Sequence, residues 1–290
     1  MRTSGDADRY GHLVTTLPVP GVANGPHHTE HEMPTDGRLF ANGFVTGQTW
    51  IFDLGTPEAP RIAAQFGDLD GYSHPHSYIR LANGNVLAAF QMRHDDAGMT
   101  PGGLVEITPE GEVVRSSSAF GPGVPRAART YSLAAVPALD RVVSTTTDMD
   151  ERNPHLSREV QIWRLSDLTL LHTFELPPGP RGDEADYTAE PRVLSDGHTV
   201  VVTTFSCGMY LLDGLEGGTP SGRLVASFPR SFPSSLRRAP NLPGAVRIRL
   251  PLLTWGFPSP SDSWFRQARP RRRPTLESSR SVCRTSWKPW

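Results

Sequence analysis

Five of the ten histidines in the chain fall in two short segments. The first segment, "NGPHHTEHEMP" at residues 24–34, carries His27, His28 and His31, and the second, "YSHPHS" at residues 72–77, carries His74 and His76. A neutral imidazole is a good ligand for copper and zinc, but a metal site needs several imidazoles to converge. A single histidine in such a segment is typical of a hydrogen-bonded polar loop. The two clusters together leave two interpretations, a metal site formed by all five histidines or a pair of polar loops.

The local sequence bears on whether neighbouring histidines can reach one ion. Successive side chains of a strand point to opposite faces, so His27 and His28 can share an ion only where the chain is irregular. The prolines that flank this segment favour an irregular loop. His74 and His76 are spaced i, i+2 around a proline, which keeps the chain extended and is expected to place both rings on one side.

Other polar residues could assist such a site or could have ordinary structural roles. Glu30 and Glu32 lie beside the last histidine of the first segment and could orient a ring or accept a proton, with surface charge as the alternative. Glu190 and Arg192 could line the same end of a channel as the histidines, or form an ion pair that stabilises their loop. Cys207, in a turn of "TTFSCGMYLL", is typical of a small buried hydrophobe rather than a nucleophile. No catalytic residue is assigned.

The elements that would position these residues are strands. Short runs of β-branched and aromatic residues between Gly, Pro, Asp and Asn clusters predict an all-β fold. The runs form strand pairs that recur four times, and a further outer strand follows each pair. The first strands of the pairs begin at anchors 47, 56 and 58 residues apart, inside or slightly above the range for four-stranded propeller blades. The pattern predicts about four blades of a β-propeller, with a β-sandwich as the alternative. The pairs are "GRLFANGF" with "TWIFDL", "GNVLAAFQ" with "GLVEIT", "DRVVSTTT" with "VQIWRL", and "GHTVVVTT" with "MYLLDG".

Charge and composition divide the chain into three parts. We expect an N-terminal segment with the His-rich loop at residues 1–36, propeller blades at 37–228, and an irregular basic tail at 229–290. Residues 1–228 hold 16 Arg and 28 acidic residues, a net charge of −12, whereas residues 229–290 hold 12 Arg, one Lys and two acidic residues, a net of +11. The tail also has ten of the 28 prolines and four of the six tryptophans.

Three interpretations of the tail remain. It could be a basic segment for nucleic acid or membrane, a disordered extension, or a frameshifted translation of GC-rich DNA, which would leave the propeller truncated. No recognition motif supports a nucleic-acid partner. The start of the chain has no apolar core of a signal peptide, and no stretch approaches 18 apolar residues, so a cytoplasmic protein without a membrane partner is expected.

The histidine segments resemble the selenium-binding protein family, which includes the bacterial methanethiol oxidases. His27 and His28 match the adjacent His-His pair of that family, and His74 and His76 match its second cluster, just before a strand of the next blade. The family continues there with an "L-x-x-G-x-[VI]-[ML]" pattern, matched here by Leu81, Gly84, Val86 and Leu87. The later "RTYSLAAVPALDRVVSTTTDM" is similar in layout to the family's next blade, and the resemblance spans roughly residues 15–228.

The resemblance implies a seven-bladed propeller whose enzymatic members use histidine-bound copper to oxidise methanethiol to formaldehyde, hydrogen sulfide and hydrogen peroxide. Here it implies copper as cofactor and a small thiol as substrate. The cysteine-bearing segment that follows the His pair in animal members is replaced by "TEHEMPT", and the tail stands where the last blades should supply another histidine. A non-enzymatic propeller that binds a ligand or protein partner and a truncated, non-functional product are the alternatives.

Overall fold

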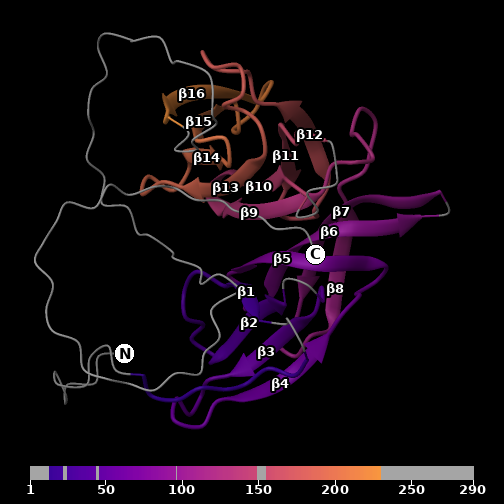
Figure 1. Cartoon of the computed structure of the whole chain (residues 1–290), viewed down its shortest axis with the longest axis vertical. Coiled ribbons are helices and arrows are strands. Elements are labelled where there is room, and N and C mark those ends of the chain that lie inside the picture. Colours follow the sequence, from indigo (N-terminus) through magenta and orange to yellow (C-terminus); the bar gives the residue numbers. More distant parts are fainter. Residues whose placement is uncertain (1–12, 22–24, 44–45, 96, 149–154, 230–290) are drawn as a thin grey trace, which may run out of the picture. The chain divides into compact units, whose positions relative to one another are not determined.

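A computed structural model of the chain describes residues 13–21, 25–43, 46–95, 97–148 and 155–229. These residues form four antiparallel sheets of four strands each, and in every sheet the strands are hydrogen-bonded in chain order (Figure 1). The predicted all-β propeller fold is confirmed, with each sheet forming one blade. The tail from residue 230 onward lies outside the described residues.

The strands of the four blades have the following bounds. Blade 1 contains β1 (Pro26–Thr29), β2 (Arg38–Gly43), β3 (Thr49–Asp53) and β4 (Arg61–Phe66). Blade 2 contains β5 (Tyr72–Arg80), β6 (Val86–Asp95), β7 (Gly98–Ile107) and β8 (Val113–Ser118). Blade 3 contains β9 (Thr130–Val136), the 3-10 turn η2 (Pro137–Leu139), β10 (Arg141–Thr146), β11 (Glu159–Arg164) and β12 (Leu170–Glu175). Blade 4 contains β13 (Thr188–Val193), β14 (Val200–Thr204), β15 (Gly208–Asp213) and β16 (Ser221–Ser227).

The predicted strand pairs form the second and third strands of the blades, β2–β3, β6–β7, β10–β11 and β14–β15. The first strand of each blade brings in the polar residues of interest. One boundary differs from the sequence prediction, because β1 lies inside the segment 1–36 and yet pairs with β2. His27 and His28 therefore lie in the first strand of blade 1 rather than in a loop that precedes the blades.

The apolar core lies between successive blades. Along β6, Val86, Ala88 and Phe90 face a cluster shared with blade 1, whereas Leu87 and Ala89 face a cluster shared with blade 3. Strand β6 is therefore buried on both faces, which explains its continuous apolar run. A third cluster joins blades 3 and 4. Burial of each valine, leucine or phenylalanine in these clusters stabilises the fold by about 1.5–3 kcal/mol, so the blades support one another.

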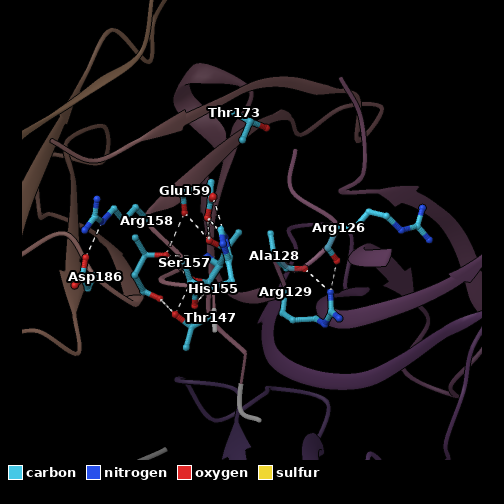
Figure 2. A network of polar contacts seen from close by, with 12 residues as sticks. Arg126, Ala128, Arg129, Thr147, His155, Ser157, Arg158, Glu159, Thr173 and Asp186 are labelled. Atoms are coloured by element: carbon cyan, nitrogen blue, oxygen red, sulfur yellow. Dashed lines mark hydrogen bonds and ion pairs between the residues drawn. The ribbon is translucent and has the colours of Figure 1, made fainter. Parts of the chain in front are cut away.

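A polar network reinforces the contact between blades 3 and 4 (Figure 2). The buried Thr188 hydroxyl of β13 accepts from the Thr146 amide at 2.9 Å and donates to the Thr146 carbonyl at 2.7 Å. The buried Glu159 carboxylate accepts from the Thr146 hydroxyl at 3.1 Å and from His155 Nε2 at 3.0 Å. Figure 2 also shows Arg158 directed at Asp186, where the two side chains form an ion pair of 2.6 Å. Buried charge at this blade contact is thus paired and hydrogen-bonded.

In the ranges that the structure describes, helix is limited to the 3-10 turn η2. No helical segment in the described part of the chain has the length and apolar character needed to cross a membrane.

Candidate metal site

A β-bulge interrupts the first strand of blade 1 at the adjacent histidines. Pro26 pairs with Gly43 and Thr29 pairs with Ala41, so His27 and His28 both lie opposite one residue of β2, Asn42. A bulge of this kind places two residues against one and redirects side chains. It provides the irregularity that two neighbouring histidines need to reach a common point.

The first strand of blade 2 has its irregularity at the second histidine cluster. Pro75 pairs with Phe90 and Ser77 pairs with Ala89, which leaves His76 as the extra residue of β5. The predicted alternation of His74 and His76 is broken at this point, because an extra residue shifts every later side chain by one position.

The first strands of blades 3 and 4 also contain a β-bulge. In β9, Thr130 pairs with Thr146 and Leu133 with Ser144, leaving Tyr131 and Ser132 opposite Thr145. In β13 the corresponding two-against-one arrangement places Ala189 and Glu190 opposite Thr203. Each first strand therefore presents side chains from a bulge at the equivalent position of its blade.

The bulges of blades 1 and 2 bring three imidazoles together. One ring nitrogen from each of His27, His28 and His76 can be chosen so that all three lie within 4.8 Å of one another. The ring centroid of His28 lies 4.2 Å from the centroid of His27 and 4.2 Å from that of His76. The centroids of His27 and His76 are 5.5 Å apart. Within the described residues, this is the only convergence of three or more His, Cys, Asp or Glu side chains with this spacing.

His76 is held in one tautomer by its neighbour in blade 3. Its Nδ1 lies 2.9 Å from the main-chain carbonyl oxygen of Tyr131. Because a carbonyl oxygen can only accept, Nδ1 carries the proton and the Nε2 lone pair is available. Nε2 is buried and makes no hydrogen bond to any described residue. A buried imidazole nitrogen without a partner, next to two further imidazoles, fits a metal ligand whose second nitrogen is already oriented.

Burial and mutual repulsion keep these histidines neutral. Burial, and then the neighbouring His28, lower the pKa of His27 to about 4, although Glu190 opposes the shift. Burial lowers the pKa of His28 to about 4 as well, with His31 and Arg192 acting in the same direction. The pKa of His76 lies well below its ordinary value, mainly because the ring is buried. At neutral pH all three imidazoles carry a lone pair that a metal ion can use.

Aromatic rings cover one side of the cluster. The Tyr131 ring lies over His76 with centroids 3.8 Å apart and planes tilted by 32°. The Phe205 ring packs edge-on against Tyr131, with ring centroids 5.8 Å apart. Burial raises the pKa of the Tyr131 phenol, and the nearby Glu190 carboxylate raises it further. The phenol therefore stays protonated across the physiological range, and the rings exclude water from this side of His76.

Blade 4 supplies a charged pair. The Glu190 carboxylate accepts from the Ser132 hydroxyl at 2.7 Å and forms an ion pair of 2.9 Å with Arg192. Ser132 in turn contacts the Ser77 hydroxyl of β5 at 3.3 Å. The prediction that Glu190 and Arg192 lie at the same end as the histidines agrees with their electrostatic effect on His27 and His28. The ion pair agrees with the structural interpretation of these two residues, and their position at one end of a channel stays a prediction.

Two of the five predicted histidines lie outside the three-imidazole group. His74 adopts a left-handed backbone conformation with φ of 57°, and its ring packs against Gly47. A Cβ added at Gly47 would lie 3.1 Å from His74 Cδ2, so this glycine accommodates the ring. His31 is exposed, and burial of part of its ring followed by the charge of Arg192 lowers its pKa.

The remaining candidate residues lie outside the three-imidazole group, and one of them has a clear structural role. Glu30 is buried and bridges two strands, because its carboxylate accepts from Arg80 of β5 at 2.8 and 3.0 Å and from the Phe40 amide of β2 at 3.0 Å. Glu32 is exposed. Cys207 lies in the turn between β14 and β15 with φ of 63°, and its thiol is 3.9 Å from the carbonyl oxygen of Phe205.

Sequence reasoning missed three contributors to the site, namely Asn42, Tyr131 and Ser132. Each acts through its position at a bulge. Tyr131 lay in a segment already compared with the next blade of the family, but only the contact between blades 2 and 3 shows that it reaches His76.

The fold and the site define a β-propeller that gathers imidazoles from the first strands of its blades. No protein-family model matches the chain. A methanethiol oxidase from Hyphomicrobium sp is 32% identical to it over 113 residues, which are 37% of this chain and 25% of that protein. The X-ray structure of a hypothetical selenium-binding protein from Sulfolobus tokodaii matches with a TM-score of 0.60 and 16% identity, covering 77% of this chain and 55% of the other. The predicted resemblance to the selenium-binding protein and methanethiol oxidase propellers is thereby confirmed. The chain spans about a quarter of the curated relative and about half of the solved structure.

Proposed function

We propose that this propeller binds copper through His27, His28 and His76 and oxidises a small thiol of the methanethiol type. The observation that carries the proposal is the convergence of three ring nitrogens within 4.8 Å of one another. One of the three residues, His76, has a buried Nε2 with no hydrogen-bond partner among the described residues. The similarity to methanethiol oxidase supports the choice of reaction.

The donor set fits copper. Imidazole nitrogen is a good ligand for both copper and zinc. Of these two metals, only copper can change its oxidation state. When bound, copper would supply one-electron exchange with a thiolate and with dioxygen. The reaction balances as methanethiol, dioxygen and water giving formaldehyde, hydrogen sulfide and hydrogen peroxide. Two electrons leave the carbon of methanethiol and reduce dioxygen to peroxide.

The residues of the chain have separate tasks in this proposal. The carbonyl of Tyr131 holds the Nδ1 proton of His76, and the Tyr131 ring excludes water from one side of the site. We assign Glu190 as the acceptor of the thiol proton, because its carboxylate is hydrogen-bonded to Ser132, the neighbour of Tyr131 in the β9 bulge. Arg192 forms an ion pair of 2.9 Å with Glu190 and helps to hold that carboxylate in position.

Copper content of the purified protein tests the proposal. We expect close to one equivalent of copper after reconstitution of the wild-type chain, and less than about a tenth of that in a variant with His28→Ala and His76→Ala. His172→Ala, which removes an exposed histidine of β12, is the matched control and should bind copper normally. Equal copper content in the double variant and the control would rule out the site.

Thiol consumption separates an enzyme from a propeller that only binds. Hydrogen peroxide and hydrogen sulfide released in equal amounts from methanethiol would support the oxidase. Copper bound at these histidines without either product would favour the non-enzymatic alternative.

A further inference from the structure

We propose that Asn42 is a positioning residue that joins the two histidine-bearing strands and fixes the spacing between His28 and His76. The inference deepens the proposed metal site and rests on it for its functional meaning. It concerns the contact between β1 and β5, the first strands of blades 1 and 2.

The Asn42 amide bridges the two strands directly. Its Oδ1 accepts from the main-chain N–H of His28 at 2.7 Å, and its Nδ2 donates to the main-chain carbonyl of Pro75 at 2.9 Å. Pro75 immediately precedes His76. The Asn42 side chain therefore holds the backbone of His28 and the backbone next to His76, although these two histidines are 48 residues apart in sequence.

The chemistry of the two contacts fixes the orientation of the amide. A main-chain N–H can only donate and a carbonyl can only accept, so the oxygen must face His28 and the nitrogen must face Pro75. Asn42 is 2% exposed, so either partner would be left unsatisfied if the side chain rotated. These constraints resist relative movement of the two strands.

Blade 3 uses the same device at the equivalent position. Thr145 lies opposite the β9 bulge, as Asn42 lies opposite the β1 bulge. Its hydroxyl accepts from the Ser132 amide at 3.2 Å and donates to the carbonyl of Ala189 in β13 at 2.5 Å. Ala189 immediately precedes Glu190, just as Pro75 precedes His76. The repeated pattern indicates that a residue opposite each of these two bulges connects it with the bulge of the following blade.

The chain offers a matched control in the same pair of blades. The Thr49 hydroxyl of β3 and the Tyr78 hydroxyl of β5 form a buried hydrogen bond of 2.7 Å. Thr49→Val removes a contact between blades 1 and 2 without touching β1. Asn42→Leu removes both bonds of the Asn42 amide with little change in side-chain size.

Hydrogen exchange in the metal-free full chain tests the positioning role. In Asn42→Leu we expect faster amide exchange in Pro26–Thr29, above all at His28, and in Tyr72–Arg80, whereas Thr49→Val should leave Pro26–Thr29 at the wild-type rate. Asn42→Asp is the second variant if Asn42→Leu does not fold. The protonated carboxyl can keep both bonds, whereas the ionised form at higher pH accepts from His28 but cannot donate to Pro75, so exchange should then rise in Tyr72–Arg80 alone.

Copper binding gives the functional readout. We expect Asn42→Leu to lower copper affinity about 10-fold and to change the Cu(II) electron paramagnetic resonance spectrum, with neither change in Thr49→Val. Unchanged exchange in Pro26–Thr29, or equal effects of the Asn42 and Thr49 variants, would overturn the inference. If the wild-type chain binds no copper at these histidines, the proposed function fails, and the metal-free exchange still decides the role of Asn42.

Discussion

The Nδ1 atom of His76 and the carbonyl oxygen of Tyr131 lie 2.9 Å apart, across the contact between blades 2 and 3. The bond fixes the tautomer of His76 through a main-chain atom, while the Tyr131 side chain covers the same imidazole. Tyr131 thus contributes a main-chain carbonyl and a side-chain ring to the site. A substitution can remove the ring but not the carbonyl.

Substitutions of Tyr131 should separate the ring from the phenol. Tyr131→Ala is expected to destabilise the fold by about 3–5 kcal/mol, because a large buried ring is lost. Loss of the cover over His76 should also weaken copper binding about 10-fold. Tyr131→Phe keeps the ring and should bind copper like the wild type. Urea unfolding and copper titration measure the two effects, and a Phe variant as weak as the Ala variant would contradict the packing role.

Substitution of Glu190 should affect turnover more than copper content. Glu190→Gln retains an acceptor for the Ser132 hydroxyl but cannot take the thiol proton, so kcat should fall about 100-fold or more. Glu32→Gln, at an exposed carboxylate of the first histidine segment, is the control and should be near wild type. Copper stoichiometry and kcat are measured on the same samples. Normal turnover in Glu190→Gln would remove Glu190 as the proton acceptor.

The two histidines of the "HPH" motif should behave differently. His76→Ala removes a member of the three-imidazole group and should lower copper affinity by more than about 100-fold, beyond the loss typical of outer-sphere partners. His74→Ala removes a ring that packs against Gly47 and should leave the affinity unchanged. Copper titration of both variants, with the melting temperature as a check on folding, makes the comparison. Equal losses would indicate that His74 is also a ligand.

The His155–Glu159 pair should make stability depend on pH. In the folded state, the hydrogen bond to Glu159 raises the pKa of His155 above its ordinary value. Burial alone would raise the pKa of Glu159, but the hydrogen bond and charge of His155 leave it below its ordinary value. The contribution from His155 is full below its unfolded pKa and is lost as pH rises through its higher folded pKa. The contribution from Glu159 is full above its unfolded pKa and is lost as pH falls through its lower folded pKa.

The pair is therefore expected to stabilise the chain most at mildly acidic pH. Urea unfolding from pH 4 to 9 should show the wild type losing stability relative to His155→Gln as pH rises above about 6.5. His198→Gln, at an exposed histidine in the turn before β14, is the control. Parallel pH curves for the wild type and His155→Gln would show that the pair makes no such contribution.

The strands of the fold could be read from the sequence because their side chains carry the signal themselves. Strand β6 is buried on both faces, and its run "VLAAF" is apolar throughout. The pairing of β2 with β3 and of β6 with β7 followed from repeated runs separated by turn residues. Such local patterns are sufficient for strands whose packing partners are their chain neighbours.

The sequence by itself determined which histidines were available, that the two clusters lie ahead of successive strand pairs, and which propeller family the chain resembles. Tertiary structure decided that His76 joins His27 and His28 while His74 does not. The reason is that a bulge depends on pairing with the neighbouring strand, and one extra residue reverses the side to which a side chain points. The Asn42 bridge and the Tyr131 cover likewise depend on contacts between blades that no local pattern encodes.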